Sequence, residues 1–81
     1  MKTITFDELI ELNRMLEEKN LKVKVHLRDA CGGQAFWIEN LDNISIPLEV
    51  YTELESFFNK KNISIAFNNS KTEFWSKNLK I

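Results

Sequence analysis

Apolar residues follow a helical period in two parts of the chain and a period of two after each, which predicts two helices and four strands. Helical spacing covers residues 5–19 and 46–61, whereas apolar and basic residues alternate from Leu21 to Arg28. The predicted strands span residues 21–28, 34–39, 62–68 and 72–76. The predicted core comprises Phe6, Leu9, Leu12, Leu16, Val23, Val25, Leu54, Phe58, Ile65 and Phe67.

Residues that favour helix ends bound the two predicted helices. Thr5 or Asp7 can cap the first helix, because a short polar side chain accepts a hydrogen bond from a free N–H of the first turn. Asn20 can end that helix in the left-handed conformation. Pro47 suits the first position of the second helix. The buried side of the second helix is predicted to comprise Leu48, Tyr51, Leu54, Phe57 and Phe58.

The second half of the chain repeats the pattern of the first. Asn20 and Asn62, 42 positions apart, each follow a lysine at the end of a predicted helix, and the apolar positions around them match. The offset falls to 38 where Phe36-Trp37 matches Phe74-Trp75, because the first copy has four extra residues between Arg28 and Gln34. Residues 4–40 and 46–78 are therefore predicted to be two copies of one unit. Any special function should lie in the elaborated turn of the first copy.

The element order αββαββ predicts an α+β fold with a single domain over residues 1–81. Each unit has a helix stripe and a sheet face to bury, so both helices should pack on one face of a four-stranded, mainly antiparallel sheet. A circular permutation of the ferredoxin-like order βαββαβ has the same element sequence, and we favour this topology. The second sheet face is then left without a helix.

Composition and charge restrict the function classes. The 11 basic and 12 acidic residues give a formal net charge of −1, which argues against a nucleic-acid partner because such proteins usually have a basic excess. Cys31 is the only cysteine, which excludes a disulfide within the chain and suits a reducing compartment. The sequence has no apolar run of roughly 20 residues and no signal-peptide core. We therefore expect a cytoplasmic protein with no membrane partner.

The turn of the first copy resembles the signature of a known family. The segment from His26 to Glu39 contains the run Arg28-Asp29-Ala30-Cys31-Gly32-Gly33-Gln34 and is similar to the RDAC family of short bacterial proteins, named after its Arg-Asp-Ala-Cys motif. The similarity extends more loosely to the preceding helix and to the second half. It implies that residues 28–34 form the signature, but the family has no established activity and implies no mechanism.

The same run contains the groups that would make a thiol reactive. Positive charge and backbone amides favour a thiolate, and Arg28 and the two following glycines could supply both around Cys31. His26 could act as a base, oriented by Asp29. The alternatives are a structural glycine turn with an inert buried cysteine, and a metal site from His26, Asp29 and Cys31. The metal site is disfavoured because the spacing matches no recognised ligand pattern, and we expect no cofactor.

Two equivalent aromatic pairs, Phe36-Trp37 and Phe74-Trp75, lie on predicted strands. Adjacent strand residues point to opposite faces, so one residue of each pair should enter the core. If the phenylalanines do so, Trp37 and Trp75 project from the open face of the sheet, where aromatic side chains can stack bases, receive a peptide or form a dimer contact. The alternative is that the tryptophans only cover the second face of a thin domain.

These patterns predict a non-catalytic binding module with a protein or peptide partner, including a second copy of the chain. The sequence has no phosphate-binding loop, dinucleotide fingerprint or nucleophile elbow that would indicate an enzyme. The alternative is a thiol-based enzyme or redox-responsive protein that acts through Cys31 with His26, Arg28 and Asp29. The predicted binding residues are Arg28, Asp29, Cys31, Gly32, Gly33, Gln34, Trp37 and Trp75.

Overall fold

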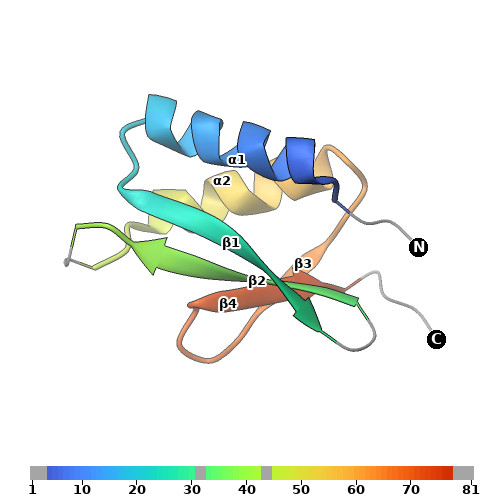
Figure 1. Ribbon diagram of the computed structural model, residues 1–81. Coiled ribbons are helices and arrows are strands. Elements are labelled where there is room, and N and C mark those ends of the chain that lie inside the picture. Colours follow the sequence, from blue (N-terminus) through green and yellow to red (C-terminus); the bar gives the residue numbers. More distant parts are fainter. Residues whose placement is uncertain (1–3, 31–32, 43–44, 78–81) are drawn as a thin grey trace.

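The computed structural model describes residues 4–30, 33–42 and 45–77, and the predictions that concern Cys31 and Gly32 lie outside these residues. Two helices and four strands follow one another in the predicted order αββαββ (Figure 1). They are α1 (Phe6–Glu18), β1 (Val23–Ala30), β2 (Gly33–Asn40), α2 (Leu48–Asn59), β3 (Ile65–Phe67) and β4 (Glu73–Ser76). The predicted α+β class is confirmed.

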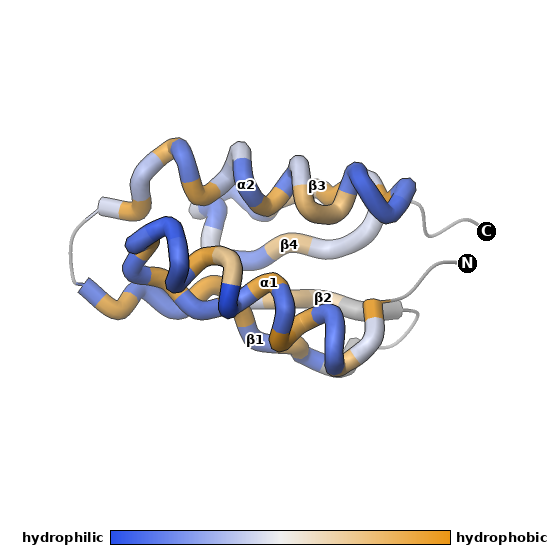
Figure 2. The backbone as a smooth tube through the Cα atoms, turned by 90° about the horizontal axis from the view of Figure 1, so that it is seen from above, coloured by the Kyte–Doolittle hydropathy of each residue, from blue (hydrophilic) through white to orange (hydrophobic). Residues whose placement is uncertain are grey.

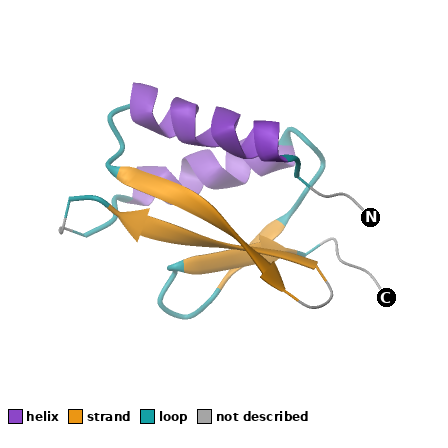
Figure 3. Cartoon of the chain, in the orientation of Figure 1, coloured by secondary structure: helices purple, strands orange, loops and turns teal. Residues whose placement is uncertain are grey.

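The four strands form one sheet in the order β1-β2-β4-β3, and every neighbouring pair is antiparallel. This is the order that results when the first strand of a ferredoxin-like sheet is moved to the end of the chain, which is the topology favoured from the sequence. Both helices lie on the same side of the sheet (Figure 3). Seen from above, α1 lies over the half formed by β1 and β2, and α2 lies over the half formed by β4 and β3 (Figure 2).

Capping side chains and left-handed asparagines set the helix ends. Thr5 and Glu8 form a reciprocal capping box at the start of α1, which confirms Thr5 as the cap. The hydrogen bond from the Thr5 backbone N–H holds the pKa of the Glu8 carboxyl below its usual value, with a smaller contribution from Lys61. Asn20 and Asn62 have φ angles of 60° and 63° after α1 and α2, as predicted for Asn20.

The helix start at Pro47 differs slightly from the prediction. Pro47 is the residue before the first turn of α2, which begins at Leu48, and it makes no side-chain cap hydrogen bond. An extended φ and ψ of −64° and 149° keep Pro47 outside the helix. The ring therefore fixes the direction in which the chain enters the helix.

The core lies between the helices and the sheet and is built around stacked phenylalanines. The Phe58 ring lies 5.5 Å from the Phe36 ring and 5.6 Å from the Phe74 ring, and Phe36 stacks on Phe74 at 5.0 Å. Fifteen apolar side chains are buried in one cluster: Ile4, Leu9, Leu12, Leu16, Leu21, Val23, Val25, Phe36, Ile38, Val50, Leu54, Phe58, Ile63, Ile65 and Phe74.

Two residues that were predicted to be buried are exposed. Phe6 has an exposed fraction of 71% and Leu48 of 79%, so both predictions are wrong. Each is the first residue of its helix, and helical side chains point towards the N-terminal end, away from the turns that pack on the sheet. Ile4, just before α1, and Val50, inside α2, are buried instead. Phe67, also predicted for the core, is only partly buried against it.

The first hairpin is longer and tighter than predicted. The β1–β2 ladder continues to the pair Ala30 and Gly33, so only two residues separate the strands where a longer loop was expected. Most of the Arg28–Gln34 segment is therefore strand. The strands of this hairpin, β1 and β2, have eight residues each, whereas β3 has three and β4 has four.

The centre of the sheet brings matching residues of the two predicted copies together. Phe36 lies directly across from Phe74, with the pairs Ala35–Trp75 and Trp37–Glu73 on either side. The outer strands do not follow the same correspondence, because Leu27 pairs with Phe36 whereas Phe67 pairs with Phe74. Leu27 and Phe67 are 40 positions apart, two fewer than the sequence offset of 42. The internal repeat therefore stays a prediction.

Candidate binding surface on the open sheet face

The sheet face opposite the helices, here called the open face, is not covered by either helix (Figure 3). The strand alternation places on it the residues whose neighbours point into the core. It carries both tryptophans, with exposed fractions of 37% for Trp37 and 41% for Trp75. Its side chains come from all four strands: Lys24, His26, Arg28, Ala35, Trp37, Glu39, Ala66, Glu73 and Trp75.

Trp75 occupies the middle of a row of small side chains. It lies across from Ala35 on β2 and from Ala66 on β3, so an alanine flanks it on each side. Phe74 precedes Trp75 in the sequence and pairs with Phe36 on β2. Both phenylalanines are buried in the core, with exposed fractions of 0% for Phe74 and 2% for Phe36. One residue of each aromatic pair therefore enters the core, as expected, and it is the phenylalanine in both pairs. In this row only the indole is a large side chain.

His26 and Trp37 form a stacked pair across β1 and β2. They are direct partners in the strand register, and their rings lie 4.3 Å apart at an angle of 20°. The His26 Nε2 atom lies 2.8 Å from Oε1 of Glu39. His26 is thus held by two residues of the neighbouring strand, which fixes the orientation of the Trp37 indole on the open face.

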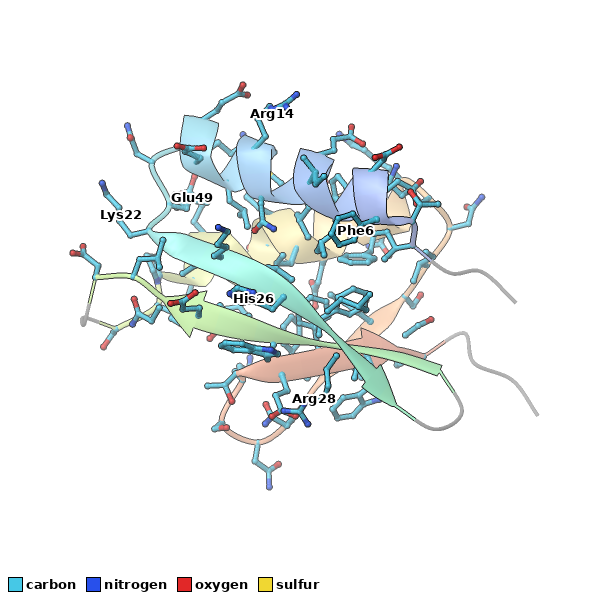
Figure 4. The ribbon with its side chains drawn as sticks, in the orientation of Figure 1. Phe6, Arg14, Lys22, His26, Arg28 and Glu49 are labelled. Carbon is cyan, nitrogen blue, oxygen red and sulfur yellow. The ribbon has the colours of Figure 1, made fainter. Side chains whose placement is uncertain are left out.

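Arg28 spans the width of β2 to reach β4. Its guanidinium donates to Oε2 of Glu73 at 2.7 Å. Arg28 is on β1 and Glu73 is on β4, the two strands that flank β2. Figure 4 labels Arg28 on the lower side of the sheet. The two side chains are 54% and 37% exposed, so water screens the pair and its contribution to stability is about 0–1 kcal/mol. Its larger consequence is positional, because it ties the cation to the middle of the open face.

The predicted thiol site is only partly within the described residues. His26 and Arg28 do lie on one face of β1, as expected, but their partners are Glu39, Trp37 and Glu73. Asp29 and Gln34 are backbone partners in the ladder, and Gly33 pairs with Ala30. Cys31 and Gly32 lie outside the described residues. In the part of the chain that the structure describes, no cluster of three His, Cys, Asp or Glu side chains could hold a metal ion.

Two features of the open face were not identified from the sequence. Glu73 as the partner of Arg28 depends on the strand order, which places β4 next to β2, and no local pattern contains that order. Ala35, by contrast, could have been found, because it lies two positions before Trp37 on a strand and must share its face. The same period places Glu39 on that face.

Comparison with known proteins adds no relative. No helix among the described residues is long and apolar enough to cross a membrane. No protein-family model, curated protein or solved structure matches the chain. The resemblance to the RDAC family therefore stays a prediction.

Proposed function

We propose that this chain is a non-catalytic interaction module that binds a protein or peptide partner through the open face. The observation that supports this most strongly is the exposure of Trp37 and Trp75 on a sheet face that neither helix covers. Tryptophan is enriched at the energetic centres of protein interfaces, because it buries a large rigid area and keeps one polar N–H. Two exposed indoles on one face of an 81-residue chain indicate a surface that is covered in a complex.

The polar side chains around the indoles support a protein partner over a nucleic acid. His26 and Arg28, the basic residues nearest the tryptophans in register, already face carboxylates at 2.8 Å and 2.7 Å. A phosphate backbone would have to displace Glu39 and Glu73 or lie against their negative charge. A protein surface needs no such rearrangement, since mutually paired polar groups at the rim of an apolar centre are typical of protein interfaces.

The shape of the face suggests how a partner docks. The row Ala35–Trp75–Ala66 leaves room on both sides of one indole, where a bulky apolar side chain of the partner can pack. A second copy of the chain can also supply such an apolar side chain. In a twofold pair of open faces, Lys24 and Arg28 of one copy can face Glu39 and Glu73 of the other. A homodimer is therefore included in the proposal.

The hairpin that follows Arg28 extends the proposed surface. The β1–β2 ladder runs through Asp29 and Gln34 to Gly33, so this end of the hairpin continues directly from the row that contains Arg28 and Ala35. In the proposal, Asp29, Cys31, Gly32, Gly33 and Gln34 also contact the partner, as the sequence predicts. The long first hairpin then has a purpose that the shorter β3–β4 hairpin does not share.

The experiment compares tryptophan variants with a matched control. Trp37→Ala and Trp75→Ala remove the indoles, whereas Leu48→Ala removes an apolar side chain that is 79% exposed at the start of α2. Self-association is measured by sedimentation velocity, and partners are captured quantitatively on each immobilised variant. Both tryptophan variants should lose self-association or specific partners that the Leu48 variant keeps. Equal self-association and equal capture by all the variants and the wild type would refute the proposal.

A further inference from the structure

A groove lies between α1 and the start of the edge strand β1. It has a volume of about 720 Å³, within the range of typical ligand pockets. Arg14 on α1 and Lys22, the residue just before β1, both line the groove, and Figure 4 labels both side chains. The groove shares only Lys24 with the open face, so it is a separate surface.

Apolar side chains form the floor and one rim of the groove. Leu21 and Val23 belong to the core and are buried, whereas Ile10 on α1 and Leu41 after β2 are 47% and 56% exposed. Six large apolar side chains are exposed in the described residues, and these two are found together here. The groove can therefore accept an apolar side chain.

The charges around this apolar floor are unbalanced. Arg14, Lys22 and Lys24 line the groove, and Glu17 is its only carboxylate. None of these three cations forms an ion pair within residues 4–30, 33–42 and 45–77, whereas Lys19, Arg28 and Lys61 do. In a chain with a net charge of −1, this is a local positive surface that is complementary to carboxylates.

The backbone of β1 is not available to a ligand in the groove. The Val25 N–H donates to Oδ1 of Asn13 at 2.8 Å, and Nδ2 of Asn13 donates to the Val25 carbonyl oxygen at 2.9 Å. The Val23 N–H donates to the Leu21 carbonyl oxygen at 2.8 Å. Three outward-facing backbone groups beside the groove are thus occupied, which interrupts the run of free groups that an added strand would need. Recognition in the groove must use side chains.

We propose that the groove binds an acidic peptide segment of a partner protein, with one bulky apolar side chain flanked by carboxylates. The apolar side chain packs against the apolar lining of the groove, and the carboxylates pair with Arg14, Lys22 and Lys24. The site shares Lys24 with the open face but does not rest on the function proposed for that face. A partner with both features would contact two sides of the module.

The test uses NMR titration of the isotopically labelled full chain with blocked pentapeptides. The probe has a central leucine with two glutamates on each side, and two control peptides replace the glutamates with lysine or the leucine with alanine. The probe should shift the backbone amides of residues 10–24 and 41, and its affinity should fall as salt is raised, because exposed charges are screened beyond about 8–10 Å at physiological ionic strength. Both control peptides should bind more weakly.

Charge-reversal variants identify the cations. Arg14→Glu and Lys22→Glu should each weaken binding of the probe by roughly fivefold, because each variant loses an exposed ion pair and gains a repulsion. Lys77→Glu makes the same charge change at the exposed residue after β4, outside the groove, and should leave the affinity unchanged. Trp75→Ala should also leave it unchanged, which separates this site from the open face.

Three results would overturn the proposal. The first is an absence of shifts with the probe at millimolar concentration. The second is an equal loss of affinity in the Lys22→Glu and Lys77→Glu variants, which would indicate a general charge effect. The third is binding of sodium octanoate in the groove without binding of the peptide, which would assign the site to a small amphipathic carboxylate.

Discussion

Replacement of Asn13 by alanine should destabilise the protein although the side chain lies on a helix and alanine is the better helix former. Asn13 is partly buried on α1, and its amide group pairs with both backbone groups of Val25 on the edge strand β1. The Asn13→Ala variant leaves this N–H and this carbonyl oxygen without protein partners. It also removes the polar connection between α1 and the strand below it.

The magnitude follows from two opposing contributions. Two hydrogen bonds of about 1 kcal/mol each are lost, and their distances of 2.8 Å and 2.9 Å are close to ideal. The change to alanine raises helix propensity by roughly 0.6 kcal/mol. The free energy of unfolding should therefore fall by about 1.5 kcal/mol. With a denaturant slope of about 1 kcal/mol/M for a chain of this size, the urea midpoint should fall by more than about 1 M.

Urea unfolding followed by circular dichroism measures this change, with Asn59→Ala as the matched control. Asn59 is the exposed last residue of α2, and its side chain makes no hydrogen bond among the described residues. The control makes the same chemical change in a helix, and its stability should stay within about 0.5 kcal/mol of wild type. Equal stability of the two variants would show that the Asn13–Val25 contact has no energetic value.

The Asn13 substitution should also change the association behaviour of the edge strand. With the Val25 peptide groups free, β1 offers a longer unpaired edge on which another strand can add. Light scattering of the folded variant should then show slow association that the Asn59→Ala control does not. This second readout does not depend on the unfolding measurement.

Three further predictions concern the caps, the core and the cysteine. The pKa of the Glu8 carboxyl is lowered in the folded state, so the ionised carboxylate stabilises the fold fully above its ordinary pKa of 4.5, and this stabilisation is lost as pH falls through the lower folded pKa. The difference in free energy of unfolding between wild type and Glu8→Gln should therefore shrink in acid. A difference that is constant from pH 2 to 7 would contradict this. Phe58→Ala should lower the free energy of unfolding by about 3–5 kcal/mol, measured in thermal or urea unfolding, because Phe58 is 1% exposed. Leu48→Ala should lower it by under about 0.5 kcal/mol, because Leu48 is 79% exposed. Similar losses in the two variants would contradict the described core. The rate of Cys31 alkylation by iodoacetamide should depend on pH in the same way in wild type and Arg28→Ala, because Arg28 is already paired with a carboxylate; a profile displaced to higher pH in the variant would support the thiol alternative.

The features predicted correctly from the sequence are those that depend on local chemistry. Thr5 is one of the two residues predicted to cap the first helix, and its side chain accepts a hydrogen bond from the Glu8 N–H. An asparagine after the last helical turn predicts a left-handed stop, as Asn20 shows. The outward direction of the tryptophans follows from the period of a strand once the adjacent phenylalanines enter the core.

The features that the sequence did not predict depend on the ends of elements and on their neighbours in space. Phe6 and Leu48 continue the apolar stripe of each helix, but a stripe does not show where the sheet beneath it ends. The contact of Arg28 with Glu73 joins residues 45 positions apart through a strand order that no local pattern contains. The bonds between Asn13 and Val25 likewise require that α1 lies beside an edge strand.

The most direct test of the open face as the binding surface uses the two indole N–H signals in the NMR spectrum. The sequence has two tryptophans and both lie on the open face, so these two signals report on that face and on no other part of the molecule. They should shift or broaden when a captured partner is added, or at the concentration where the chain self-associates, while the methyl signals of Leu48 stay unchanged. Partner binding or self-association that leaves both indole signals unchanged would contradict the proposed surface.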